Sequence, residues 1–335
     1  MEYEDIVNFD TKLTADVTEW RPSVDQNQLA CGTYFLDKEK NSRLGMLYLL
    51  IIDHIGKKIE IAETREFLKS GILDLKWLDS EKILTIDSNN CLKLFNIDQE
   101  LKLVQTDEIM IGNEKSIGLA IDFFKEPNQY KIISSDTLGY LNMSVLNDSM
   151  RIETRLKAHD LETWSVLMDK SETNVIYSGS DDCSLKIWDL RGSKKCGECK
   201  IFEGGVTSIV LPEQLDGIWL KSYSEYNLIC GSYDEKIYVL DKRNLKRSVK
   251  ESKKLNGGVW KMKLDGNKGL ILCACMHTGV HVVDSESLES RLYYDKHGLD
   301  NLAYGCDWKK IGQDSLVATC SFYNHQLNIW KIKFH

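Results

Sequence analysis

Short runs of alternating hydrophobic and polar residues recur along the whole chain. The apolar positions in these runs fall two apart, as in LKLF (92–95), LKIW (185–188) and LNIW (327–330). A period of two is typical of strands that bury one face. Polar turns rich in Gly, Asn, Asp and Ser separate the runs, so the pattern predicts an all-β chain.

The runs are organised in a repeated unit of about 47 residues. The third run of each unit ends at six recurring positions: Phe95, Ser144, Trp188, Leu240, Val283 and Trp330. Each unit also has a first run with a late aromatic residue, such as ILDLKW (72–77), and a second run that ends in small residues, such as IYSGSD (176–181). A seventh unit is present in TEW (18–20) and LACGTYFL (29–36).

Seven units of four short strands predict one seven-bladed β-propeller over residues 1–335. The repeat length and the Trp-Asp ending at 188–189 resemble the WD-repeat family. A two-sheet sandwich with coincidental spacing is the alternative, and the constant internal order of six units disfavours it. The expected blades cover roughly residues 11–60, 70–110, 115–150, 157–200, 203–250, 255–295 and 300–335.

Composition and charge exclude several classes of function. The net charge is −8 at pH 7 with no basic stripe, which argues against direct binding of nucleic acid. The longest apolar run, MLYLLII (46–52), is too short to cross a bilayer, so no membrane partner is expected. The N-terminus lacks a signal-peptide pattern, and the ten cysteines have no framework spacing, so we expect a cytoplasmic protein with free thiols.

No motif indicates a metal or a cofactor. Cys196 and Cys199 form a lone Cys-x-x-Cys pair, whereas a structural zinc site needs about four ligands. The chain has no Walker loop, no dinucleotide-binding glycine motif and no His-Glu-x-x-His motif. The sequence therefore predicts neither a metal nor a cofactor.

Two sets of loops are expected to meet at one end of a propeller channel: those that lead into the inner strands and the hairpins between second and third strands. These loops carry aromatic residues, histidines and carboxylates but few Lys or Arg. A concave mouth with aromatic walls and a few polar groups is typical of a binding site. The candidate residues are Trp164, Trp260, Tyr233, Tyr304, Asp234, Glu162, Gly257, Gly258, Cys275, His277 and His325.

Some loop residues have a structural alternative. His159 lies where WD-repeat blades often hold a histidine bonded to a strand-end serine and a tryptophan, here Ser178 and Trp188. Asp234 lies at a tight turn, where a carboxylate often caps the backbone. A free cysteine such as Cys275 is usually a buried and inert thiol.

Several loop segments point to one particular WD-repeat family. GSYDE (231–235), GGVWKMK (257–263), CACMHTG (273–279) and CSFYNH (320–325) are not general WD-repeat consensus. They resemble the diphthine methyl ester esterase family, also called the diphthamide biosynthesis protein 7 family, and the likeness covers essentially the whole chain. The resemblance implies a substrate on translation elongation factor 2, a modified histidine with a trimethylammonium group and a methyl ester.

The implied reaction is hydrolysis of that ester to diphthine, although such proteins are sometimes named methyltransferases. A quaternary ammonium group donates no hydrogen bond, so aromatic faces and carboxylates are its natural partners. Trp164, Trp260, Tyr233 and Tyr304 are the candidate walls of the binding site. The candidate counter-charges are Asp234, Glu162 and Asp181.

Ester hydrolysis also needs a base or nucleophile and donors for the oxyanion. The backbone amides of Gly257 and Gly258 are candidate donors. His277 is the preferred general base and His325 the second choice, because both lie in hairpin turns where histidine has no usual structural role. Cys275 is a candidate nucleophile. The chain has no Gly-x-Ser-x-Gly motif, so a standard serine esterase is not expected.

A non-catalytic scaffold is the alternative function. WDLR (188–191) and LDKR (240–243) end successive blades. Paired endings of this form resemble the docking motif of ubiquitin-ligase substrate receptors, which would make a ubiquitin-ligase adaptor the partner. Fold alone does not separate a scaffold from an enzyme.

Overall fold

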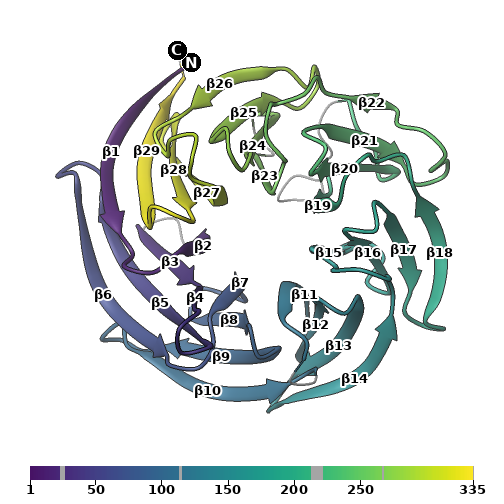
Figure 1. Ribbon diagram of the computed structural model, residues 1–335, viewed down its shortest axis with the longest axis horizontal. Helices are drawn as coiled ribbons and strands as arrows, with labels where there is room; N and C mark the ends of the chain where they lie inside the picture. Colours follow the sequence, from purple (N-terminus) through teal and green to yellow (C-terminus); the bar gives the residue numbers. More distant parts are fainter. Residues whose placement is uncertain (23–26, 113–114, 213–221, 266–267, 335) are drawn as a thin grey trace.

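Seven sheets stand around a central channel like the blades of a propeller (Figure 1). The computed structural model of the chain describes residues 1–22, 27–112, 115–212, 222–265 and 268–334. The regular elements of these residues are strands β1 to β29. The predicted seven-bladed β-propeller is therefore confirmed.

The first three blades follow one another along the chain, each with its first strand nearest the channel (Figure 1). Blade 1 comprises β2 (Ala15–Trp20), β3 (Gln28–Thr33), β5 (Ser42–Asp53) and β6 (Lys58–Phe67), with the short β4 (Phe35–Asp37) paired to β5. Blade 2 comprises β7 (Ile72–Trp77), β8 (Lys82–Asp87), β9 (Cys91–Ile97) and β10 (Leu103–Met110). Blade 3 comprises β11 (Gly118–Glu126), β12 (Gln129–Asp136), β13 (Tyr140–Leu146) and β14 (Met150–Lys157).

The next three blades repeat this order. Blade 4 comprises β15 (Ser165–Met168), β16 (Val175–Gly179), β17 (Leu185–Asp189) and β18 (Lys194–Cys199). Blade 5 comprises β19 (Val206–Val210), β20 (Asn227–Ser232), β21 (Ile237–Asp241) and β22 (Lys250–Glu251). Blade 6 comprises β23 (Lys261–Asp265), β24 (Leu270–Ala274), β25 (Val280–Asp284) and β26 (Ser290–Tyr294).

Blade 7 is built from both ends of the chain. It comprises β27 (Ala303–Ile311), β28 (Asp314–Ser321), β29 (Gln326–Lys333) and, as its outer strand, β1 (Glu2–Asp10). Because β1 pairs antiparallel with β29, the two chain ends lie together (Figure 1). Residues 2–10 precede the first range expected for a blade, and they close the ring by pairing with the outer edge of β29.

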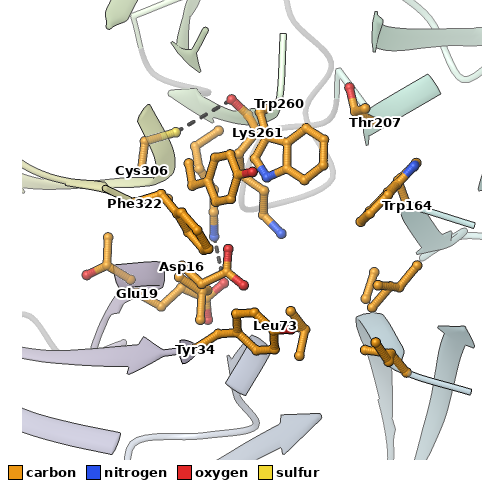
Figure 2. A pocket seen from close by; sticks show the side chains of 18 of the residues that line it. Asp16, Glu19, Tyr34, Leu73, Trp164, Thr207, Trp260, Lys261, Cys306 and Phe322 are labelled. Atoms are coloured by element: carbon orange, nitrogen blue, oxygen red, sulfur yellow. Dashed lines mark hydrogen bonds and ion pairs between the residues drawn. The ribbon is translucent and has the colours of Figure 1, made fainter. Parts of the chain in front are cut away.

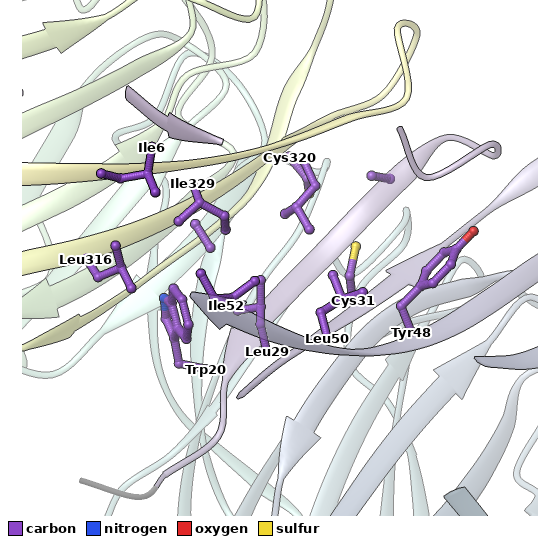
Figure 3. Close-up of a cluster of buried hydrophobic side chains, with 13 residues drawn as sticks. Ile6, Trp20, Leu29, Cys31, Tyr48, Leu50, Ile52, Leu316, Cys320 and Ile329 are labelled. Atoms are coloured by element: carbon purple, nitrogen blue, oxygen red, sulfur yellow. The ribbon is translucent and has the colours of Figure 1, made fainter. Parts of the chain in front are cut away.

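Apolar side chains fill the space between neighbouring blades. At the junction of blades 1 and 7, Trp20 and Leu29 pack with Leu316, Ile329 and Ile6 in one buried cluster (Figure 3). Burial of apolar surface contributes roughly 25 cal/mol per Å². The ring is thus closed by side-chain packing as well as by the β1–β29 ladder.

His159 holds the loop before β15 to its blade. Its Nε2 lies 2.8 Å from Ser178 Oγ, and Trp188 Nε1 donates to the same oxygen at 3.0 Å. Its Nδ1 lies 2.9 Å from Asp182 Oδ2. The structural interpretation of His159 is therefore confirmed.

Blade 7 uses a similar arrangement that the sequence reading did not identify. His297 lies between Ser321 Oγ at 2.9 Å and Thr319 Oγ1 at 2.8 Å, and Trp330 Nε1 donates to Thr319. His297 is almost fully buried, and burial lowers its pKa to about 4.

This histidine makes stability depend on pH. Because its pKa is lower in the folded state than the ordinary value of about 6.5, its contribution is complete above pH 6.5 and is lost as pH falls toward 4. Between pH 7.5 and 5, wild type should therefore lose about 2 kcal/mol more than His297→Gln, whose side chain does not titrate. Denaturant unfolding at the two pH values measures this difference. His277→Gln changes an exposed histidine and is the control, which should lose as much stability as wild type between the two pH values. An equal loss of unfolding free energy in all three proteins would contradict the role of His297.

Candidate active site

The start of each inner strand turns one side chain per blade into the channel. In β2, β7, β11, β19 and β27 the pairing register shifts at this point, as in a β-bulge, which re-aims the side chain there. In blades 4 and 6 the residue directly before the inner strand takes this position. The seven residues, which we call the inner ring, are Asp16, Leu73, Leu119, Trp164, Thr207, Trp260 and Tyr304.

Aromatic side chains of the inner ring and of two hairpins form a continuous arc. The ring centroids of Trp164 and Trp260 are 5.0 Å apart, those of Trp260 and Tyr304 4.9 Å, and those of Tyr304 and Phe322 5.0 Å. Tyr34 stacks on Phe322 at 6.4 Å. The arc and the rest of the inner ring line a cavity of about 240 Å³, which we call the aromatic basin (Figure 2).

Asp16 is the inner-ring residue with an ionisable carboxyl group. It projects into the basin beside Phe322 and Tyr34, across from Trp164 (Figure 2). Among the described residues, none donates a hydrogen bond to its carboxylate. Burial raises the pKa of Asp16 well above the usual carboxylate value; the charge of Asp74 adds to this effect and that of Lys261 opposes it. In the free basin Asp16 is therefore held toward its neutral form.

A network of ion pairs lies beneath the basin and links four blades across the channel. Its members are Glu19, Asp74, Lys76, Lys261, Lys263 and Asp307. Lys263 Nζ and Lys76 Nζ lie 2.6 and 2.7 Å from Glu19 Oε1. Burial alone would raise the pKa of Glu19, but the two lysines outweigh burial and lower it to about 2. The negative charge of Glu19 is thus balanced by two lysines, whereas Asp16 has no such ion pair among the described residues.

The network separates the basin from a second cavity on the same axis. This second cavity has a volume of about 450 Å³ and is lined by Asp74 and Lys76 among other residues. Glu19, Lys261 and Lys263 line both cavities, so the ion pairs lie where the two meet. The basin therefore has a charged floor under its aromatic walls.

Three of the predicted binding residues lie together in the basin. Trp164, Trp260 and Tyr304 come from blades 4, 6 and 7, and each contacts the next through its ring. Each is half-buried, as expected of a wall exposed to a cavity. The sequence reading thus identified the aromatic part of the inner ring.

The other predicted binding residues lie outside the basin lining. Tyr233 is 48% exposed. The carboxylate of Asp234 is engaged within the protein, because it accepts hydrogen bonds from the backbone of Glu203, in the loop before β19, and from Tyr238 Oη. Glu162 is half-buried, and its backbone carbonyl accepts from the amide of Asp181. The structure therefore does not bring these groups to the rings of Trp164, Trp260 and Tyr304.

Gly257 and Gly258 are accounted for by packing. A Cβ at Gly257 would collide with the carbonyl oxygen of Cys275, and one at Gly258 would come within 2.9 Å of the Tyr233 ring. The two glycines let the chain before β23 pass close to these neighbouring turns. Neither glycine lines the basin.

The predicted catalytic residues also lie apart from the basin. His277 is exposed in the β24–β25 turn. His325 is half-buried in the β28–β29 turn, where its backbone carbonyl accepts from Thr11. Cys275 is fully buried in an apolar cluster, its Sγ lies 3.6 Å from the carbonyl oxygen of Cys273, and burial raises its pKa. That is the environment of an inert thiol rather than of a nucleophile.

The structure also places the cysteines and other potential metal ligands. All ten cysteines are free thiols, and Cys196 is exposed whereas Cys199 is buried. Within the described parts of the chain, no group of three or more His, Cys, Asp or Glu side chains is placed to hold a metal ion. The same parts contain no helix long and apolar enough to cross a bilayer.

The paired blade endings lie on exposed edges of blades 4 and 5. Arg191 bonds to Asp189 with an Nη2–Oδ2 distance of 2.6 Å, and Arg243 bonds to Asp241 at 2.7 Å. Both guanidinium groups are mostly exposed. Both remain accessible to a partner of the kind that a scaffold would dock.

Asp16 and Lys261 were missed as site residues, although the repeat contains a signal for Asp16. Asp16 lies four residues before Trp20, as Leu73 lies before Trp77 and Tyr304 before Trp308. Aligning the units on these late aromatic residues places Asp16 at the same position as Tyr304. The first unit was instead recognised only from TEW onward, so its channel-facing residue was overlooked.

Comparison with known proteins agrees with this architecture. Residues 150–189 match the family "WD domain, G-beta repeat". The chain is 28% identical to a diphthine methyltransferase homolog of Dictyostelium discoideum, over 95% of this chain and 96% of that protein. It is 29% identical to the diphthine methyltransferase of Homo sapiens, over 89% and 73% of the two chains. It is 30% identical to the diphthine methyltransferase of Saccharomyces cerevisiae, over 89% and 91%. With this level of identity over nearly the full length of both chains, the protein belongs to the diphthine methyltransferase family of WD-repeat proteins.

Proposed function

We propose that this chain is an esterase of diphthamide biosynthesis. In this proposal it hydrolyses the methyl ester of methylated diphthine on translation elongation factor 2 in the cytoplasm and leaves diphthine. The names of its relatives support a role in that pathway. We favour hydrolysis because the loop segments GSYDE, GGVWKMK, CACMHTG and CSFYNH resemble those of the diphthine methyl ester esterase family.

The aromatic basin is the observation that carries the proposal. The trimethylammonium group of the substrate is a cation without N–H donors, so it gains little from hydrogen-bond acceptors alone. Aromatic faces attract such a cation by about 0.5–2 kcal/mol each. Trp164, Trp260 and Tyr304 supply three faces, and Asp16 supplies a carboxylate without a protein partner among the described residues.

Binding of the cation also prepares a base. A positive charge beside Asp16 favours its ionised form, which burial disfavours in the free basin. The ionised carboxylate then accepts a proton from a water molecule as the water oxygen bonds to the ester carbonyl carbon. The tetrahedral intermediate breaks its bond to the methoxy oxygen, which takes the proton back from Asp16 and leaves as methanol. The other product is the carboxylic acid, which ionises in water.

Cation binding should be linked to proton release. Below the raised pKa of Asp16, binding of tetramethylammonium expels the carboxyl proton, so affinity should increase with pH until Asp16 is ionised in the free protein. Calorimetry in two buffers with different ionisation enthalpies measures the protons released. Asp16→Asn should abolish the release and lower affinity about tenfold, and Trp260→Ala should lower it about 2- to 30-fold.

Asp181→Asn is the matched control for this experiment, since it removes an exposed loop carboxylate outside the basin. It should retain wild-type affinity and proton release. An Asp16→Asn protein that binds tetramethylammonium as wild type does would show that the cation binds elsewhere.

Hydrolysis itself is tested on elongation factor 2 that carries methylated diphthine. Wild type, incubated without any added cofactor, should convert the methyl ester to the acid, as read from the mass of the modified peptide. Asp16→Asn should slow the reaction by about 100-fold or more, the usual contribution of a general base. His277→Ala should remain within about twofold of wild type, because its side chain is exposed outside the basin lining.

If His277→Ala is inactive and Asp16→Asn is active, the general base is His277, as the sequence alone suggested. If wild type produces no acid, the proposed reaction is refuted. The exposed Arg191 and Arg243 edges would then favour the scaffold alternative with a ubiquitin-ligase adaptor as partner.

A further inference from the structure

Lys261 is the cation at the junction of the basin and its charged floor. It is the first residue of β23, directly after Trp260, and it lines both cavities. Its Nζ lies 3.3 Å from Asp74 Oδ1, which is its one acceptor among the described residues. A lysine ammonium has three N–H donors. Two donors of Lys261 are thus available to a molecule in the basin.

The other two lysines of the network are better satisfied. Lys263 lies 2.6 Å from Glu19 and 3.7 Å from Asp307. Lys76 lies 2.7 Å from Glu19 and 3.7 Å from Asp74, and it also donates to the backbone carbonyl of Leu75. Lys76 does not line the basin. Lys261 is therefore the lysine best placed to donate to a ligand.

Asp16, once ionised, and Lys261 give the basin two groups of opposite charge. They act on each other, since the charge of Lys261 opposes the effect of burial on Asp16. The aromatic faces of Trp260 and Tyr304 line the same cavity. A complementary ligand carries a quaternary cation and an acyl oxygen close together, as in an ester or acid with the ammonium group on its α-carbon.

We propose that Lys261 binds the acyl oxygen of such an α-quaternary ammonium ester and stabilises the oxyanion of its hydrolysis. This inference rests on the proposed function and assigns the oxyanion donor that the sequence reading had placed at Gly257 and Gly258. The cation lies against the aromatic arc and Asp16, and the carbonyl oxygen points to Lys261 Nζ. Charge develops on that oxygen when water attacks, so the interaction strengthens in the transition state.

The same arrangement sets specificity. A ligand with a quaternary cation but no acyl group, such as tetramethylammonium, uses the aromatic arc and Asp16 alone. A ligand with both groups, such as trimethylglycine, also uses Lys261. Wild type should therefore bind trimethylglycine more tightly than tetramethylammonium.

The test compares Lys261→Met with Lys76→Met. Both variants remove one lysine that faces Asp74 in the same network, but only Lys261 lines the basin. Lys261→Met should slow ester hydrolysis on elongation factor 2 by about 100-fold or more, as loss of an oxyanion donor does. It should also lose the preference for trimethylglycine over tetramethylammonium. Lys76→Met should keep the preference and hydrolyse within a few-fold of wild type.

Each result bears on the inference separately from the proposed function. If wild type hydrolyses the ester and Lys261→Met does so equally well, the role of Lys261 is overturned and the function stands. If Lys76→Met shows the same losses as Lys261→Met, the effect comes from the ion-pair network and the role is likewise overturned. If wild type does not hydrolyse the ester but Lys261→Met selectively loses trimethylglycine, the proposed function fails and the acyl-binding role is retained.

Discussion

The register shift at the start of the inner strands is the constraint on which the site depends. In a regular strand, successive side chains alternate between the two faces of the sheet, and these faces pack against the neighbouring blades. One extra residue at the start of the strand, as at Asp16 or Tyr304, turns a side chain toward the channel instead. Five inner strands have this shift, and in blades 4 and 6 the residue directly before the inner strand takes the same position, so residues far apart in the sequence converge on a single cavity.

Convergence alone would be costly for charged groups, because a buried ion loses its hydration. In the floor of the channel this cost is offset by ion pairs: Glu19 pairs with Lys76 and Lys263, and Asp74 pairs at longer distances with Lys76 and Lys261. These pairs join blades 1, 2, 6 and 7, so they also fix the position of the inner strands relative to one another. Asp16 lies only three residues from Glu19 but lacks such partners among the described residues. The contrast supports the proposal that the charge compensating Asp16 comes with a ligand.

Much of this architecture follows from local patterns, and the parts that do not have physical reasons. Period-two runs and their repeat are local, so the seven blades were predictable, as was the bonding of His159 to Ser178 and Trp188. The pairing of β1 with β29 joins opposite ends of the chain and leaves no local trace. Asp234 looked like a binding residue because a turn carboxylate has the same sequence signature whether it faces a ligand or, as here, accepts hydrogen bonds from Glu203 and Tyr238 of the protein. Asp16 was overlooked because the direction of its side chain, rather than its residue type, makes it part of the basin.

The inner ring is also asymmetric, and this asymmetry bears on how the proposed substrate would be oriented in the basin. Trp260, Tyr304 and Asp16 belong to consecutive blades 6, 7 and 1, whereas blades 2 and 3 contribute Leu73 and Leu119. A cation therefore binds most favourably against Trp260, Tyr304 and Asp16, and an aliphatic chain packs best against Leu73 and Leu119. Because the ring is closed and its floor is cross-linked by ion pairs, these preferences are set before a ligand arrives. Orientation by a preformed cavity lowers the entropic cost of placing an ester beside a carboxylate and an ammonium group. A closed propeller can in this way support chemistry that depends more on accurate placement of a ligand than on a large number of reacting groups.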